Sequence, residues 1–148
     1  MLTPTRAAIA LRWLLIANGV MTLCALPAVF LPTAWMDAFH RNLGLGPLPE
    51  GPIVQYLARS VSALYAAFGS LTLVLAWDLA RFAPLITWWG ITAVVFGALL
   101  LWVDTTAPMP AHWTWGEVPY LVLTGAVVLL LQSRLPEPQI VANRATVD

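Results

Sequence analysis

Long apolar runs separated by short polar segments dominate the chain, and four of these runs are long enough to cross a bilayer. An α-helix needs about 20 consecutive, mostly apolar residues to span the hydrocarbon core. The four runs lie at about residues 9–31, 53–77, 82–103 and 117–132. The pattern therefore predicts an all-α membrane protein whose four transmembrane helices form an up-down-up-down bundle.

A short amphipathic helix is predicted at about residues 34–43, between the first two spans. Pro27 loosens the end of the first span and Pro32 ends it, whereas Thr33 can cap the new helix and Gly44 can close it. The apolar side chains of this segment share one face, as in helices that rest on a membrane surface. We expect it to lie in the outer membrane interface.

The connections constrain the arrangement of the spans. Only residues 78–81 separate the second span from the third, so these two spans are expected to be antiparallel neighbours. Residues 44–52 and 104–116 have the composition of turn-rich loops. We assign residues 1–135 to a single four-helix transmembrane domain and residues 136–148 to a cytoplasmic tail.

The composition indicates that lipid is the solvent for much of the surface. Of the 148 residues, 60% are hydrophobic and 9% are charged, whereas soluble domains are about 45–50% apolar and about 25% charged. The formal net charge is zero, so nothing in the charge balance favours a nucleic-acid partner. The expected partners are membrane lipids and either other membrane-protein subunits or further copies of the chain.

The positions of the arginines predict the orientation, because cytoplasmic segments of membrane proteins are enriched in positive residues. All seven cations of the chain are arginines. With the N-terminus inside, five of them are cytoplasmic, namely Arg6, Arg12, Arg81, Arg134 and Arg144, and two, Arg41 and Arg59, belong to the outer half. We therefore expect a multi-pass protein with both termini in the cytoplasm.

Arg59 is the charged residue that lies deepest within a predicted span. It follows the start of the second span by six positions, which is about 9 Å along a helix. A charge at that depth costs a few kcal/mol unless it pairs or reaches the interface. Glu117 and, as a close second choice, Asp104 lie at span ends on the same side, so we predict a buried ion pair or a ligand anchor.

The same region suggests a binding site for a lipophilic molecule. Tyr56, His112 and Trp115 lie near the outer ends of the spans and are expected to line an outer pocket around Arg59. A quinone or a lipid is the kind of ligand that such a pocket would take. No cofactor is predicted, and contact with a lipid, quinone or pigment is left open.

Small residues mark the faces on which helices are expected to pack, because they let helix backbones approach closely in lipid. They are Ser62, Ala66 and Gly69 in the second span, and Gly90, Ala93 and Gly97 in the third.

Residue types that carry catalysis or bind metals are scarce. Both histidines, His40 and His112, lie outside the spans and form no helical ligand pair. Cys24 is the only cysteine, which excludes an internal disulfide and a cysteine zinc site. We predict no catalytic residue and no metal site, and this favours a role other than that of an enzyme.

Residues 53–134 resemble small four-helix membrane proteins of bacteria. The segments that carry the resemblance are Arg59-x-x-Ser62-Ala-Leu-Tyr-Ala66-x-x-Gly69 and Asp78-x-x-Arg81-x-x-Pro84-Leu-Ile. The layout is similar to the DoxX-like group, whose members are four-helix proteins sometimes associated with redox complexes. This resemblance implies a bundle in the bacterial inner membrane and assigns no functional residue.

Two functional hypotheses are consistent with these features. The leading one is an accessory or scaffold subunit of a larger bacterial inner-membrane complex of a redox or energy-transducing kind, favoured by the surplus of small-residue grooves and the lack of catalytic motifs. The alternative is a small membrane module that binds a quinone or lipid in the outer pocket near Arg59.

Overall fold

The computed structural model describes residues 3–107 and 109–136, which form helices joined by turns and short loops. The elements are α1 (Pro4–Leu23), the 3-10 helix η1 (Leu26–Val29), α2 (Thr33–Asn42), α3 (Pro52–Trp77), α4 (Ala83–Thr106) and α5 (Ala111–Gln132). Within the described residues, four segments are long and apolar enough to cross a membrane: α1 with η1, α3, α4 and α5. The predicted all-α fold with four spans and a short additional helix is confirmed. The predicted tail lies, after Pro136, outside the described residues.

Prolines account for where several helices begin and end. The predicted first span is continuous to residue 31, but α1 ends at Leu23 and a 3-10 helix follows. Pro27 explains the break, because it lacks an N–H and its ring clashes with the carbonyl four residues earlier. At the other end of the chain, α5 begins directly after Pro110, six residues before the predicted start, so Trp113 belongs to the fourth span.

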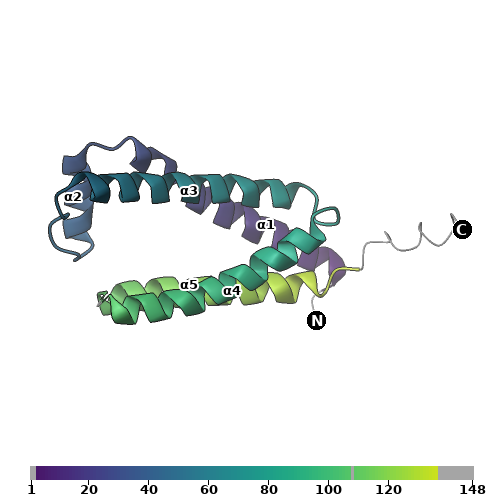
Figure 1. Cartoon of the computed structure of the whole chain (residues 1–148). Helices are drawn as coiled ribbons and strands as arrows, with labels where there is room; N and C mark the ends of the chain where they lie inside the picture. Colours follow the sequence, from purple (N-terminus) through teal and green to yellow (C-terminus); the bar gives the residue numbers. More distant parts are fainter. Residues whose placement is uncertain (1–2, 108, 137–148) are drawn as a thin grey trace, which may run out of the picture.

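The four long helices form two packed pairs. Helix α1 packs along α3, and α4 packs along α5, with a smaller contact between α1 and α5. Figure 1 shows that the two pairs approach each other where α1 begins and α5 ends, and that they diverge toward α2. We call these regions the convergent end and the divergent end. The second and third spans, α3 and α4, are antiparallel, but they are neighbours only near their connection.

Glycines allow the helix backbones within each pair to approach closely. A Cβ atom added to Gly69 of α3 would lie 2.7 Å from the carbonyl oxygen of Gly19 in α1 and 2.6 Å from the backbone nitrogen of Leu23. In the other pair, a Cβ added to Gly125 of α5 would lie 2.7 Å from the carbonyl oxygen of Gly90 in α4. No side chain fits at either contact unless the backbones move apart.

The hydrophobic core lies toward the convergent end and joins the two pairs. Its largest fully buried apolar side chains are Leu11, Leu15, Ile86 and Val128, contributed by α1, α4 and α5. Trp89 of α4 stacks on Phe68 of α3 with ring centroids 6.1 Å apart, and its Nε1 donates a hydrogen bond to Oγ1 of Thr72 at 3.0 Å. These contacts hold α3 against α4 where the two helices are still close.

Replacement of Gly69 tests the close contact between α1 and α3. We expect Gly69→Ala to lower the free energy of unfolding by about 1–3 kcal/mol, because the new methyl group meets backbone atoms that cannot rotate away. The measurement is thermal or denaturant unfolding of the purified protein in detergent.

Gly116→Ala is the matched control for this substitution. Gly116 also lies inside a helix, α5, but a Cβ there would meet nothing within 4 Å. Alanine at this position is expected to leave stability unchanged or to raise it by up to about 1 kcal/mol. Equal stability of the two variants would contradict the proposed packing role of Gly69.

Candidate functional site

Arg59 binds backbone carbonyl groups. It extends from α3 toward the chain that follows α1, where its Nη1 donates to the Val29 carbonyl at 2.7 Å and its Nη2 donates to the Leu31 carbonyl at 3.1 Å. Carbonyl groups at the end of a helix have no partner within that helix. The half-buried Arg59 side chain therefore caps the end of η1 and ties it to α3.

The predicted ion pair between Arg59 and Glu117 or Asp104 is not formed. Among residues 3–107 and 109–136, the only ion pair joins Arg41 to Asp37. The carboxylate of Glu117 accepts a hydrogen bond from Nε1 of Trp113 in its own helix, at 2.8 Å. The divergence of the helix pairs explains the difference, because both acids belong to the α4–α5 pair, whereas Arg59 belongs to the other pair.

Asp104 is a buried carboxylate with a free oxygen atom. Asp104 is 6% exposed, and its Oδ2 has no hydrogen-bond partner in the part of the chain that the structure describes. Asp104 follows Gly97 by seven residues and Gly90 by fourteen, so all three share the face of α4 that packs on α5. The carboxylate thus lies at the divergent end of the α4–α5 pair, separate from Arg59.

The side chains expected to line an outer pocket do not come together around Arg59. Tyr56 and Trp115 are 65% and 75% exposed, and neither lines the pocket between α2 and its loop or the pocket beside Arg12 and Asp78. Nε2 of His112 donates a hydrogen bond to the carbonyl of Leu43 at 3.0 Å. This contact joins the start of α5 to the end of α2, so His112 bridges the two helix pairs at the divergent end.

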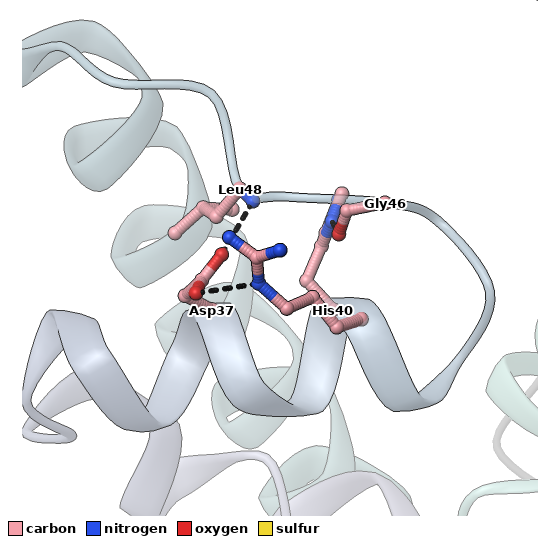
Figure 2. Close-up of polar contacts among 5 residues, drawn as sticks. Asp37, His40, Gly46 and Leu48 are labelled. Carbon is pink, nitrogen blue, oxygen red and sulfur yellow. Dashed lines mark hydrogen bonds and ion pairs between the residues drawn. The ribbon is translucent and has the colours of Figure 1, made fainter.

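Two hydrogen bonds hold helix α2 to the loop that follows it, and an ion pair within α2 lies beside them, as Figure 2 shows in close-up. Asp37 accepts hydrogen bonds from Nε of Arg41 at 2.8 Å and from the backbone N–H of Leu48 at 2.8 Å. Nδ1 of His40 donates to the carbonyl of Gly46 at 2.9 Å. Both histidines thus bind carbonyl groups, and the described residues contain no group of three side chains suited to a metal ion.

Two open pockets of about 650 Å³ each lie at opposite ends of the molecule. One lies between α2 and its loop, and its lining includes Asp37, Arg41 and Glu50. The other lies at the convergent end, and its lining includes Arg12 and Asp78. The sequence gives no signal for the second pocket, because its residues come from segments that only the packing of the helices brings together.

The small residues predicted at helix contacts occupy such positions in most cases. Gly69, Gly90 and Gly97 each lie where a Cβ atom would approach a neighbouring helix to less than 3.0 Å. Ala66 and Ala93 are buried at 5% and 8% exposure. Ser62 is half-buried, and its hydroxyl donates to the Ala58 carbonyl of its own helix, so it forms no polar link between helices.

Comparison with known proteins adds no relative to this picture. No protein-family model matches the chain, and neither a curated protein nor a solved structure matches it. The resemblance to the DoxX-like group therefore stays a prediction from the quoted segments.

Removal of the Arg59 side chain tests its role as a cap. We expect Arg59→Ala to lower the free energy of unfolding by about 1.5–3 kcal/mol, because two carbonyl groups lose a charged donor. In a double-mutant cycle measured by unfolding, its effect should add to that of Glu117→Ala within about 0.5 kcal/mol. A coupling energy well above that value would mean that Arg59 and Glu117 form the ion pair after all.

Titration of Asp37 tests the contacts of α2. The hydrogen bond from Arg41, followed by that from the Leu48 N–H, holds the pKa of Asp37 below its usual value of 3.8. A lowered folded-state pKa means that these contacts stabilise the fold above pH 3.8 and that the stabilisation is lost as the pH falls through the folded-state pKa. In an NMR titration, Arg41→Ala should raise this pKa toward the usual value.

Arg6→Ala is the control for that titration, since Arg6 is an exposed arginine of α1 that does not contact Asp37. This variant should leave the pKa of Asp37 as it is in the unmodified protein. An equal shift in both variants would show that overall charge, and not the contact with Arg41, sets the pKa.

Proposed function

We propose that the protein is an accessory or scaffold subunit of a larger complex in the bacterial inner membrane. The observation that carries this proposal is an exposed strip of small residues on α3, made of Ala63, Ala67 and Ser70. Spacings of four and three residues place the three side chains on one face of the helix. We call this surface the small-residue strip.

The small-residue strip differs from the faces that α3 uses within the fold. Ala66 and Gly69 lie on the face that packs against α1, and Phe68 contacts α4 through Trp89. Helical periodicity places the strip on a third face, directed away from both neighbours. A transmembrane helix with three packing faces can bind a partner helix without rearrangement of its own bundle.

The chemistry of the strip favours a helix over lipid as its neighbour. Helix association in membranes depends on close packing, and small side chains let two backbones approach. The hydroxyl of Ser70 donates to the carbonyl of Ala67 at 2.7 Å, so the strip presents no unpaired donor to the membrane. A flat and internally satisfied surface of this kind suits a partner helix that carries small residues of its own.

The positions of the arginines support the proposed orientation. The start of α1, the connection between α3 and α4, and the end of α5 all lie at the convergent end, so Arg6, Arg12, Arg81 and Arg134 lie there. Arg41 and Arg59 lie toward the divergent end. A positive excess at one end is the pattern of a cytoplasmic side, and we assign the convergent end, with both termini, to the cytoplasm. The likeness to the DoxX-like group makes redox complexes the first partners to search.

The alternative function, binding of a quinone or lipid near Arg59, has less support from the described residues. The guanidinium of Arg59 is occupied by two carbonyl groups. Tyr56 and Trp115 are mostly exposed and lie in different helix pairs. A ligand at this position would have to replace contacts that already hold α3 to η1.

Enlargement of the small-residue strip tests the proposed function. Ala63→Leu combined with Ala67→Leu should leave the fold intact, because both side chains point away from neighbouring helices. The double variant should lose its partner during purification in gentle detergent, since a loss of about 1–3 kcal/mol from overpacking corresponds to roughly a tenfold to hundredfold weaker complex.

Ala98→Leu is the matched control, because Ala98 is an exposed alanine on α4. This variant should retain the partner at the original stoichiometry. The proposal is wrong if the unmodified chain purifies as a monomer, or if it forms only a dimer with itself. It is also wrong if the enlarged strip and the control retain the same amount of a larger membrane protein.

A further inference from the structure

The pocket at the convergent end combines charged walls with an apolar floor. It has a volume of about 650 Å³ and lies between α1, the connection from α3 to α4, and the end of α5. Its polar lining includes Arg12, Asp78 and Gln132, and its apolar lining includes Leu79 and Leu129. A pocket of this composition at the end of transmembrane helices lies at the depth of lipid headgroups.

Arg12 and Asp78 carry opposite charges and line the same pocket, yet they do not pair. Within the described part of the chain, Arg41 and Asp37 form the only ion pair. Among the described residues, Arg12 makes a single long side-chain contact, from Nη2 to the Trp77 carbonyl at 3.5 Å, which leaves most of its five donors without a partner there. Oδ1 of Asp78 accepts from the Arg81 N–H at 3.0 Å, and its Oδ2 accepts no hydrogen bond from a described residue.

Gln132 adds negative character to the wall of the pocket. Its Nε2 donates to the carbonyl of Ala83, which fixes the orientation of the amide and joins the end of α5 to the start of α4. Its Oε1 is buried and has no hydrogen-bond partner among the described residues. An uncompensated carbonyl dipole beside the pocket favours a positive group within it.

Two opposite charges that do not pair with each other, at headgroup depth, fit a ligand that is itself dipolar. Guanidinium groups bind phosphate through several donors in one plane, and a carboxylate accepts hydrogen bonds from an ammonium group. We propose that this pocket binds the headgroup of an aminophospholipid, with the phosphate at Arg12 and the ammonium at Asp78. The acyl chains then extend from the apolar floor at Leu79 and Leu129 into the membrane.

The same charges exclude close chemical relatives of this ligand. A phosphocholine headgroup has no N–H to donate to Asp78, so it loses that hydrogen bond. A phosphoglycerol headgroup has no cation to bind Asp78, and its net negative charge is repelled by that carboxylate. The pocket is therefore selective for the primary ammonium group. This inference does not depend on the role of the small-residue strip, which lies elsewhere on α3.

Native mass spectrometry of the full chain in detergent tests the selectivity. The probes are phosphatidylethanolamine, phosphatidylcholine and phosphatidylglycerol with identical acyl chains, each titrated separately. The unmodified protein should bind phosphatidylethanolamine at least about tenfold more tightly than the other two, as expected for a charged hydrogen bond made by only one ligand. Equal binding of all three lipids would overturn the proposal.

Variants of the two charged residues separate the roles of the headgroup contacts. Asp78→Asn keeps the acceptor for the Arg81 N–H and should abolish the preference for phosphatidylethanolamine over phosphatidylcholine without weakening phosphatidylcholine binding. Arg12→Gln should lower the affinity for both of these lipids by about tenfold or more, because both carry the phosphate. If Asp78→Asn keeps the preference, the ammonium does not lie at Asp78 and the proposal is wrong.

Two controls keep the outcome interpretable. Arg6→Ala removes an exposed arginine of α1 that does not line the pocket, so it should leave all lipid affinities unchanged. A loss equal to that of Arg12→Gln would show that general attraction of phosphate to basic residues accounts for binding, and this would overturn the site. The variant with an enlarged small-residue strip should bind phosphatidylethanolamine as the unmodified protein does, so failure of the proposed function and failure of this site give different results.

Discussion

The structure depends on close approach of helix backbones at glycine residues. In a membrane the hydrophobic effect does not drive helices together, because lipid tails are as apolar as the side chains that contact them. Stability then comes from packing between surfaces that fit. The contact of Gly19 with Gly69 and the contact of Gly90 with Gly125 supply that fit once in each helix pair. For this reason the molecule consists of two closely packed helix pairs, α1 with α3 and α4 with α5.

Polar contacts add to the connection that the hydrophobic core makes between the pairs. Nδ2 of Asn18 in α1 donates to the hydroxyl of Tyr120 in α5 at 2.6 Å, and Trp89 donates to Thr72 between α4 and α3. In an apolar surrounding an unpaired polar group is costly, so each of these bonds favours one relative position of the pairs. At the divergent end, His112 and the backbone of Leu43 provide a further link through α2. The apolar core and these hydrogen bonds together determine how far apart the two pairs lie.

The apolar pattern was sufficient to predict the spans, because each crossing needs about 20 apolar residues whatever their neighbours are. It could not predict which helices pack together, since the short connection after Trp77 is compatible both with packing along the whole length and with divergence. The partner of Arg59 was missed for a related reason. A search for opposite charges cannot find the Val29 and Leu31 carbonyls, which are free because the chain leaves the α-helical conformation near Pro27. The amino-acid composition does not reveal which backbone carbonyl groups become free where a helix breaks.

The two ends of the molecule differ in how their charges are used, and the difference follows from the packing. At the divergent end, Asp37 and Arg41 satisfy each other on one helix, and Arg59 binds carbonyl groups. At the convergent end, Arg12 and Asp78 come from different segments and line one pocket, and within the described residues they form no ion pair with each other. Opposite charges that line one pocket without pairing are suited to a ligand that bridges them. The same helix packing that stabilises the fold thus leaves the polar groups at the convergent end available for binding.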